Sequence, residues 1–255
     1  MAKKPWIGTN WKMNKTFAEA DEFTRILSGS DFAVSDNVQL FAIPSFPAIS
    51  RVAEALKNTK VLVGAQNIHW EDEGQFTGEV SPVQAKDAGA RIALIGHSER
   101  REMFGETDET VSLKAAAAVK HGLVALICIG DTRDEFDAGR TGEVLKRQTE
   151  IALSRIDWSQ SGATVVVAYE PVWSIGTRGT PAEPAFVEEK HGEIKHLFQS
   201  SLGRDLSLLY GGSVNPQNAV DLATRPGIDG LFIGRSAWNA DGLVSIVRDV
   251  TDALA

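Results

Sequence analysis

Short apolar runs alternate along the chain with longer segments of helical spacing. Eight runs of β-branched and aliphatic residues predict strands, which begin near Trp6, Val38, Lys60, Arg91, Leu123, Thr164, Leu206 and Asp229. Their starts lie about 32 residues apart, close to the roughly 30 residues of one strand–helix–strand unit. The central runs are continuously apolar, as expected of parallel strands that are covered on both faces.

The segments between these runs predict helices. In two of them, 144–156 and 186–198, the apolar residues fall mostly on one face of a 3.6-residue period. Two others open at Ser81-Pro82 and Asn215-Pro216, where proline suits the first helical turn. Eight alternating units predict an α/β protein with a single domain over residues 1–255, a closed (β/α)8 barrel rather than an open doubly wound sheet.

Composition and charge narrow the function classes. The 255 residues include 26 Lys and Arg against 34 Asp and Glu, a formal net charge of −8. This balance argues against nucleic acid or an anionic membrane as a partner, so an anionic ligand has to be captured locally. The single cysteine, Cys128, excludes an intramolecular disulfide and suits a reducing compartment. Because no signal peptide and no apolar run of about 20 residues is found, we expect a cytoplasmic protein.

In a (β/α)8 barrel the active site lies at the carboxyl ends of the strands, so only eight places need to be searched. The first run ends at Asn10, which Lys12 closely follows, and the fourth is followed by His97 and Glu99. The sixth ends at Glu170. A carboxylate, a histidine and a lysine at separate strand ends can form a proton-transfer site.

Glycine-rich turns follow the seventh and eighth runs, at 211–213 and 234–236. Such turns ahead of helices offer backbone N–H groups to an anion, usually a phosphate. Each candidate also has a purely structural interpretation: His97 can cap a helix, Lys12 can be a surface charge, and the glycines can form tight turns. The functional interpretation is favoured because the spacing brings all of them to one rim.

Other chemistries find no support. The segments 96–100 and 211–215 lack the last glycine of a serine-hydrolase elbow. His191 and His196 do not have the spacing of zinc ligands, so no metal site is predicted. The chain has no Walker loop and no dinucleotide fingerprint. Cys128 lies inside an apolar run without an activating partner, which predicts a buried small hydrophobic residue rather than a nucleophile.

The sequence resembles the triosephosphate isomerase family almost from end to end. The segments that carry the resemblance are GTNWKMNKT (8–16), AQN (65–67), FTGEVSP (76–82), GHSERREMFGET (96–107), AYEPVWSIGT (168–177) and YGGSVNPQN (210–218). The resemblance implies a TIM barrel, and an isomerase that needs no cofactor because the transferred proton leaves and returns. It also implies a homodimer, in which the loop 66–80 reaches into the partner and Thr77 lies near the partner's catalytic lysine.

The same resemblance assigns roles to the residues at the strand ends. It makes Glu170 the general base and His97 the neutral electrophile that polarises the substrate carbonyl. The family is itself a standard illustration of this acid–base arrangement. Lys12 would supply a positive charge beside the enediolate and Asn10 would help to fix the geometry. Glu99 resembles the family's partner for that lysine.

The resemblance also implies a phosphate site and a lid. Gly176, Ser213 and Gly234 correspond to the family's phosphate-binding backbone positions. Residues 171–181 (PVWSIGTRGTP) resemble the family's closing lid, which excludes water so that the enediolate does not eliminate phosphate.

The chain departs from the usual family pattern at several turns. Arg235 stands where a glycine approaches the phosphate; either its side chain points outward while its N–H still binds, or it adds a guanidinium to the site or reshapes the pocket for a different substrate. Arg178-Gly179 stand where the family usually has glycine and then lysine, and His69-Trp70 are unusual in the third loop.

These departures resemble a divergent branch of the family that acts on four-carbon sugars. The segments concerned are HWEDEGQFTGE (69–79) and DGLFIGRSAWN (229–239). That branch interconverts L-erythrulose-1-phosphate and D-erythrulose-4-phosphate in tetritol breakdown, by the same enediol proton shuttle. The glycolytic reaction, dihydroxyacetone phosphate to D-glyceraldehyde-3-phosphate, is the alternative. A catalytically inactive sugar-phosphate-binding member is a second class, and an indole-glycerol-phosphate synthase, whose motifs are absent, is a third.

Overall fold

A closed barrel of parallel strands forms the centre of the molecule. The computed structural model describes residues 4–160, 162–176 and 179–255. Within them eight strands pair in chain order, and β8 pairs with β1 to close the ring. The strands are β1 (Trp6–Asn10), β2 (Gln39–Ile43), β3 (Leu62–Ala65), β4 (Ile92–Ile95), β5 (Val124–Ile129), β6 (Val165–Tyr169), β7 (Ser207–Tyr210) and β8 (Gly230–Ile233). The predicted barrel is therefore confirmed, and each strand falls on a predicted apolar run.

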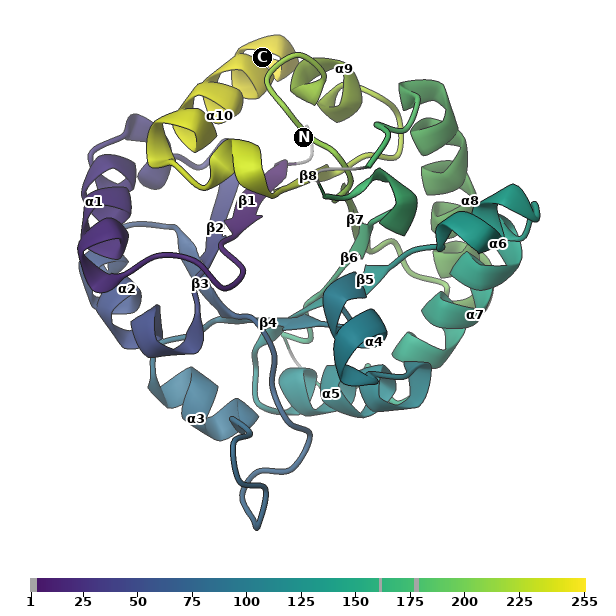
Figure 1. Ribbon diagram of the computed structural model, residues 1–255, viewed down its shortest axis with the longest axis horizontal. Coiled ribbons are helices and arrows are strands. Elements are labelled where there is room, and N and C mark those ends of the chain that lie inside the picture. Colours follow the sequence, from purple (N-terminus) through teal and green to yellow (C-terminus); the bar gives the residue numbers. More distant parts are fainter. Residues whose placement is uncertain (1–3, 161, 177–178) are drawn as a thin grey trace.

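Helices surround the barrel as an outer ring (Figure 1). The α-helices are α1 (Phe17–Ser28), α2 (Ile49–Leu56), α3 (Pro82–Asp87), α4 (Ser98–Phe104), α5 (Asp108–Lys120), α6 (Arg133–Asp137), α7 (Thr141–Leu153), α8 (Pro184–Leu202), α9 (Ala219–Ala223) and α10 (Ala240–Leu254). Four short 3-10 helices are η1 (Asp31–Ala33), η2 (Phe46–Ala48), η3 (Val172–Ser174) and η4 (Arg235–Ala237). Among the described residues, no helix has the length and apolar character that crossing a membrane requires.

One of the two predicted helix starts is confirmed, and the other lies a few residues before its helix begins. Ser81 caps α3 and Pro82 is its first residue, with Ser81 Oγ accepting a hydrogen bond from the Gln84 N–H. At Asn215, however, the side-chain oxygen accepts from the Gln217 N–H at 2.9 Å and forms a turn. The Asn215 side-chain oxygen also accepts from the Asn218 N–H at 3.2 Å, and the Asn215 carbonyl accepts from the Ala219 N–H at 3.0 Å, so residues 215–218 form a turn that leads directly into α9 at Ala219.

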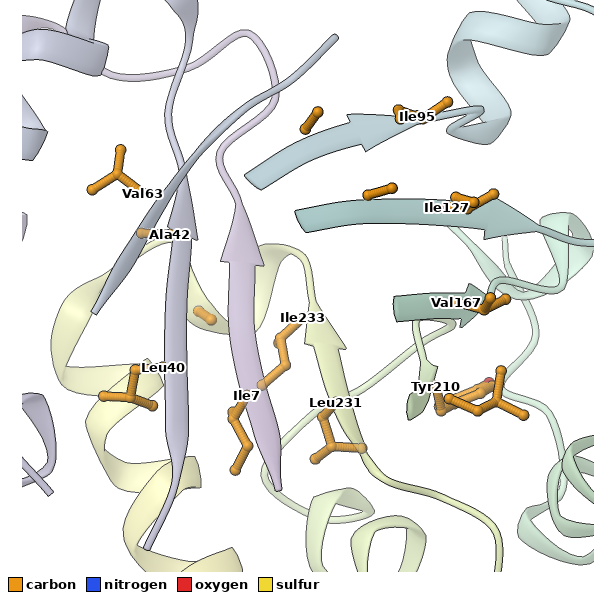
Figure 2. Packing of buried hydrophobic residues seen from close by; sticks show 14 of the residues in the cluster. Ile7, Leu40, Ala42, Val63, Ile95, Ile127, Val167, Tyr210, Leu231 and Ile233 are labelled. Atoms are coloured by element: carbon orange, nitrogen blue, oxygen red, sulfur yellow. The ribbon is translucent and has the colours of Figure 1, made fainter. Parts of the chain in front are cut away.

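Consecutive residues of each strand face opposite sides, so the buried side chains form two layers. The larger layer lies between the strands and the helices. In it Ile7 of β1 lies beside its register partner Leu231 of β8 (Figure 2). The smaller layer fills the barrel interior and includes Phe41, Leu126 and Cys128.

Glycines on two strands make room for large side chains in the interior. A Cβ at Gly8 would lie 2.4 Å from the ring of Phe41, and one at Gly64 would lie 2.9 Å from Ile43 Cγ1. The Phe41 ring packs against Phe232 with centroids 5.7 Å apart. The barrel is thus a packed core whose open space lies at its carboxyl end, where the predicted site residues follow the strands.

Candidate active site

A cavity of about 660 Å³ opens at the carboxyl ends of the strands. Every residue that the sequence predicts for catalysis or phosphate binding lines it. They are Asn10 and Lys12 after β1, His97 and Glu99 after β4, Glu170 and Gly176 after β6, Ser213 after β7, and Gly234 and Arg235 after β8. Barrel closure therefore brings together residues from five separate loops.

A second cavity, of about 680 Å³, lies on the other side of Glu170. Its lining includes Cys128, Arg133 and Trp173, with several carboxylates and arginines, but not the glycine turns after β7 and β8. Since the turns that can hold an anion open into the first cavity, the first cavity is the candidate active site.

Glu170 is a buried carboxylate at the floor of this cavity. It is 4% exposed, and its Oε2 atom has no hydrogen-bond partner. Two glycines give it space: a Cβ at Gly211 would lie 2.6 Å from Glu170 Cγ, and one at Gly130 would lie 2.0 Å from the Glu170 carbonyl oxygen. A carboxylate oxygen that is buried and unpaired at a cavity floor is a strong acceptor for a proton of a bound ligand.

His97 faces Glu170 across the floor. The distance from His97 Nε2 to Glu170 Oε2 is 3.9 Å, too long for a hydrogen bond but short enough for both groups to reach one bound molecule. His97 is also the N-cap of α4, and its Nδ1 atom accepts the Glu99 N–H at 3.2 Å. An acceptor at Nδ1 carries no proton, so a neutral ring has its proton on Nε2, which faces the cavity. The predicted capping role and the catalytic role are therefore compatible.

Lys12 presents its ammonium group to the same space. Its Nζ donates to Glu99 Oε1 at 2.5 Å, and its backbone N–H donates to Asn10 Oδ1 at 2.8 Å. Lys12 has a φ of 54°, a left-handed conformation that is costly for a residue with a Cβ. The Gln66 side chain compensates by donating to the Lys12 carbonyl at 2.8 Å.

Backbone N–H groups also line this cavity. Within the described part of the chain, the N–H groups of Gly176 and Gly234 have no protein acceptor. Gly176 has a φ of 85°, which favours glycine, and a Cβ there or at Gly234 would meet nothing within 4 Å. These N–H groups are therefore available to an anionic group.

Comparisons with known proteins agree with this geometry. The family model described as triosephosphate isomerase matches residues 5–250. The chain belongs to the triosephosphate isomerase family. It is 52% identical to the L-erythrulose-1-phosphate isomerase of Rhizobium rhizogenes over 95% of this chain and 93% of that protein. It is 51% identical to the protein of that name from Brucella melitensis over 96% and 95% of the two chains. The crystal structure of triosephosphate isomerase from Bartonella henselae matches with a TM-score of 0.86 and 34% identity, over 96% and 98% of the two chains.

Membership of the triosephosphate isomerase family makes this chain an enzyme, an isomerase of phosphorylated sugars. The described residues contain no group of three or more His, Cys, Asp or Glu side chains that could hold a metal ion.

Cys128 is buried beside the base, as the sequence predicts. It is 1% exposed. Burial, reinforced by the Glu170 carboxylate, raises the pKa of the Cys128 thiol well above its usual range. The thiol therefore stays protonated at neutral pH, which confirms that it is a buried small side chain and not an activated nucleophile.

Arg235 reaches across the cavity mouth to the loop after β6. Its side chain is exposed, and its Nη2 atom donates to the Gly176 carbonyl at 2.9 Å. The Arg235 side chain therefore lies at the cavity and does not point away from it, and the neighbouring Gly234 lines the same cavity. This contact joins two departures from the family pattern, the turn after β8 and the predicted lid.

The predicted lid, 171–181, is described except for 177–178. Arg178 therefore lies outside the described residues. At Gly179 a Cβ would lie 2.3 Å from the Ser174 carbonyl oxygen, so only glycine fits there. The Thr180 N–H donates to the Trp173 carbonyl at 3.2 Å and returns the backbone towards η3.

The loop 66–80 extends beyond the ring of helices between β3 and α3 (Figure 1). The unusual His69 is buried in it, stacked on Trp70 with ring centroids 4.1 Å apart and packed against Phe76 at 4.2 Å. Asp72 ties the loop to the end of α5 by an ion pair with Lys120 at 2.8 Å. The two unusual residues therefore order the loop and lie outside the active-site cavity.

Two residues that support the site were not identified from the sequence. Asp131 is fully buried and accepts hydrogen bonds from Tyr169 Oη at 3.1 Å, Thr141 Oγ1 at 2.7 Å and Trp173 Nε1 at 3.2 Å, which fixes the start of the predicted lid. Trp238 lines the cavity, and its Nε1 donates to the Asn10 carbonyl at 2.9 Å. Both follow strands, and their position at the carboxyl rim was the available signal.

Proposed function

We propose that this protein is an L-erythrulose-1-phosphate isomerase, which interconverts L-erythrulose-1-phosphate and D-erythrulose-4-phosphate. The observation that carries the reaction type is the buried pair of Glu170 and His97 facing one cavity, which the glycine turns after β7 and β8 also line. The choice of substrate is supported by relatives of that name at about half identity over nearly the whole chain.

The proposed reaction is a proton shuttle through an enediolate. Glu170 removes the proton from C3 of L-erythrulose-1-phosphate, and the electron pair of that C–H bond forms the C2–C3 double bond while O2 takes the negative charge. His97 protonates O2 from Nε2 and removes the proton from O3. The C3 carbonyl then forms as Glu170 returns its proton to C2. Lys12 stabilises the oxyanion by its charge, Asn10 fixes the geometry, and Glu99 orients Lys12.

The fourth carbon constrains where the pocket has to differ from that of a triose enzyme. In L-erythrulose-1-phosphate the phosphate and the carbonyl are separated by one CH2 group, as in dihydroxyacetone phosphate. The additional CH2OH group is attached to the reacting carbon that is distant from the phosphate. Space for it is therefore needed beside Asn10, Lys12 and His97, whereas Arg235 acts at the phosphate end.

Phosphate binding is assigned to the backbone turns and to one side chain. Gly176, Ser213 and Gly234 would donate N–H groups to the phosphate, and Arg235 would add a positive charge. The described parts of the predicted lid, 171–176 and 179–181, would exclude water from the enediolate. Local capture of this kind is required because the whole chain is acidic.

A homodimer is part of the proposal. Large apolar side chains are exposed after four successive strands: Met13 after β1, Phe46 after β2, Phe76 after β3, and Met103 and Phe104 after β4. Successive strands are neighbours in the barrel, so these side chains share one sector of the rim. An exposed apolar sector is typical of a protein interface. The loop 66–80, with the exposed Thr77, would enter the partner there.

The remaining assignments concern the setting of the enzyme. The chain is proposed to act as one domain over 1–255, because the barrel closes only when β8 pairs with β1. A cytoplasmic location is proposed because the only cysteine is free and buried, which suits a reducing compartment.

A steady-state comparison of two substrates tests the proposed reaction. We expect a higher kcat/KM for L-erythrulose-1-phosphate than for dihydroxyacetone phosphate. A preference for the triose by orders of magnitude would instead establish the glycolytic reaction, which the 34% identity to a solved triosephosphate isomerase keeps as the second candidate. Turnover of neither sugar phosphate would contradict both.

A further inference from the structure

We propose that Arg235 is a bridging residue that holds the Gly176 carbonyl and the substrate phosphate at the same time. Its guanidinium would thereby couple the position of Gly176 to the binding of phosphate. This inference rests on the proposed function, because it takes the turns at Gly176, Ser213 and Gly234 as the phosphate site.

The charge of Arg235 is available to a ligand. Lys12 and Arg235 are the two cationic side chains that line the described part of the cavity. Lys12 is paired with Glu99 at 2.5 Å. Arg235 forms no ion pair with a carboxylate among the described residues, and its Nη2 atom donates instead to the neutral Gly176 carbonyl. An uncompensated guanidinium at the mouth of a cavity attracts a phosphate dianion.

The geometry of a guanidinium allows both contacts at once. Arginine presents five N–H donors in a rigid plane, and a single bond from Nη2 to Gly176 leaves Nε and Nη1 free to donate. Because the bond to Gly176 already restricts the long side chain, less rotational freedom is lost when phosphate binds. A lysine would supply the charge but not this planar, two-sided donor set.

Gly176 would then be fixed from both of its polar groups. Its carbonyl accepts from Arg235, and its N–H has no acceptor among the described residues and lies in the lining of the same cavity. Its φ of 85° is a conformation that favours glycine. The carbonyl and the N–H belong to two peptide units joined at the Gly176 Cα, so holding the carbonyl keeps that Cα, and with it the N–H, beside the cavity, and Arg235 acts as a positioning residue as well as a ligand.

Three substitutions separate the two functions of the side chain. Arg235→Gln keeps an N–H donor for Gly176 without the charge, Arg235→Lys keeps the charge without the planar fork, and Arg235→Ala keeps neither. Arg204→Gln is the matched control, because Arg204 is an exposed arginine that stacks on Trp158 at the opposite, amino-terminal end of β7. The probe is inorganic phosphate, whose Kd is measured by titration calorimetry at low and high salt. The Gly176 amide resonance is followed in the same titration.

We expect the Kd for phosphate to rise at least about tenfold in Arg235→Gln and Arg235→Ala, and its salt dependence to weaken. In Arg235→Lys the Kd should rise less, but phosphate should no longer protect the Gly176 amide from exchange. The KM of L-erythrulose-1-phosphate should rise in all three, with kcat lowered in Arg235→Lys and Arg235→Ala. Arg204→Gln should match the unsubstituted protein.

An unchanged phosphate Kd in Arg235→Gln and Arg235→Ala would overturn the inference, as would equal protection of Gly176 in Arg235→Lys. If the unsubstituted protein did not turn over L-erythrulose-1-phosphate but bound phosphate in a manner dependent on Arg235, the proposed substrate would be wrong and the inference would be supported. The binding and kinetic measurements thus distinguish the two failures.

Discussion

Single residues in this site combine structural and chemical roles. His97 caps α4 through Nδ1, and the same hydrogen bond leaves Nε2 as the proton-bearing atom that faces the cavity. Glu170 has a buried oxygen without a partner, a condition that costs stability in most places and that suits the proposed base. A residue that a stability argument alone would find unfavourable is therefore one to which the proposed reaction gives a role.

Replacing the proposed base tests the assignment of Glu170. Glu170→Gln has nearly the same shape but cannot accept the proton, so we expect turnover of L-erythrulose-1-phosphate to fall by at least about 10²–10⁴-fold. The fold should be retained, as judged by circular dichroism and the Kd for phosphate. Turnover within a few-fold of the unsubstituted protein would contradict the assignment.

Buried His191 predicts a pH-dependent loss of stability. Burial lowers the pKa of His191 from 6.5 to about 4, while its Nδ1 atom lies 3.1 Å from the Gly227 carbonyl. Between these two pH values the unfolded chain binds a proton that the folded chain does not. The free energy of unfolding should therefore be fully retained above pH 6.5 and fall by about 1.4 kcal/mol per pH unit below it, down to about pH 4.

Urea unfolding from pH 7 to pH 4.5 measures this slope. His191→Asn should remove the contribution of one proton to the dependence of the free energy of unfolding on pH, whatever its effect on stability at pH 7. His196→Asn on the same helix is the control, because His196 is exposed and should leave the slope unchanged. An equal slope in His191→Asn and the unsubstituted protein would show that other groups cause the loss.

At the scale of elements, turns rather than strands distinguish this chain. Gly211 gives space to Glu170, whereas Gly176 and Gly234 keep N–H groups open to the cavity. Trp238 joins the turn after β8 to the end of β1 by its bond to the Asn10 carbonyl. Adjacent turns therefore stabilise each other, and a substitution in one loop is expected to change the positions of residues in the loop beside it.

The capping box of α3 allows a test at this scale. Ser81 Oγ accepts the Gln84 N–H at 3.1 Å, and Gln84 Oε1 accepts the Ser81 N–H at 3.0 Å. Ser81→Ala removes the cap, so we expect the free energy of unfolding to fall by about 1 kcal/mol. The exposed Ser50→Ala in α2 should change it by less than about 0.5 kcal/mol. Equal values for the two variants in urea unfolding would contradict the capping role.

At the scale of the whole molecule, the exposed apolar sector predicts the assembly. Met13 is 95% exposed and Phe104 is 67% exposed, and both follow strands in the half of the rim from β1 to β4. Exposure of this size is unfavourable in a monomer and would be relieved by burial against a second copy.

A charge in this sector should separate the subunits. We expect Met13→Glu to convert the proposed dimer to a monomer at micromolar concentration, as measured by sedimentation velocity. Turnover should fall with it, since Thr77 of each subunit would leave the partner's site. Val34→Glu is the control, because Val34 is an exposed apolar residue after η1, away from that sector. A Met13→Glu dimer as stable as that of Val34→Glu would contradict the proposed interface.

Much of the fold was predictable from local patterns. The continuous apolar runs correctly predicted all eight strands, because buried parallel strands need apolar side chains on both faces. The helix start at Asn215-Pro216 was predicted a few residues early, because the Asn215 side chain stabilises a turn that precedes α9. Strand ends predicted most of the site residues, whereas Gly176 and the roles of all of them came from the resemblance to the family.

By itself, the sequence determined the barrel, the rim that carries the site, and the type of each group there, because periodicity and strand ends are local properties of the chain. Only the tertiary structure decided which atoms meet. Barrel closure sets His97 3.9 Å from Glu170, aims the Trp238 indole at Asn10, and brings the Arg235 guanidinium to the Gly176 carbonyl. Contacts between residues tens to hundreds of positions apart depend on how the whole ring packs, and no local pattern encodes that distance.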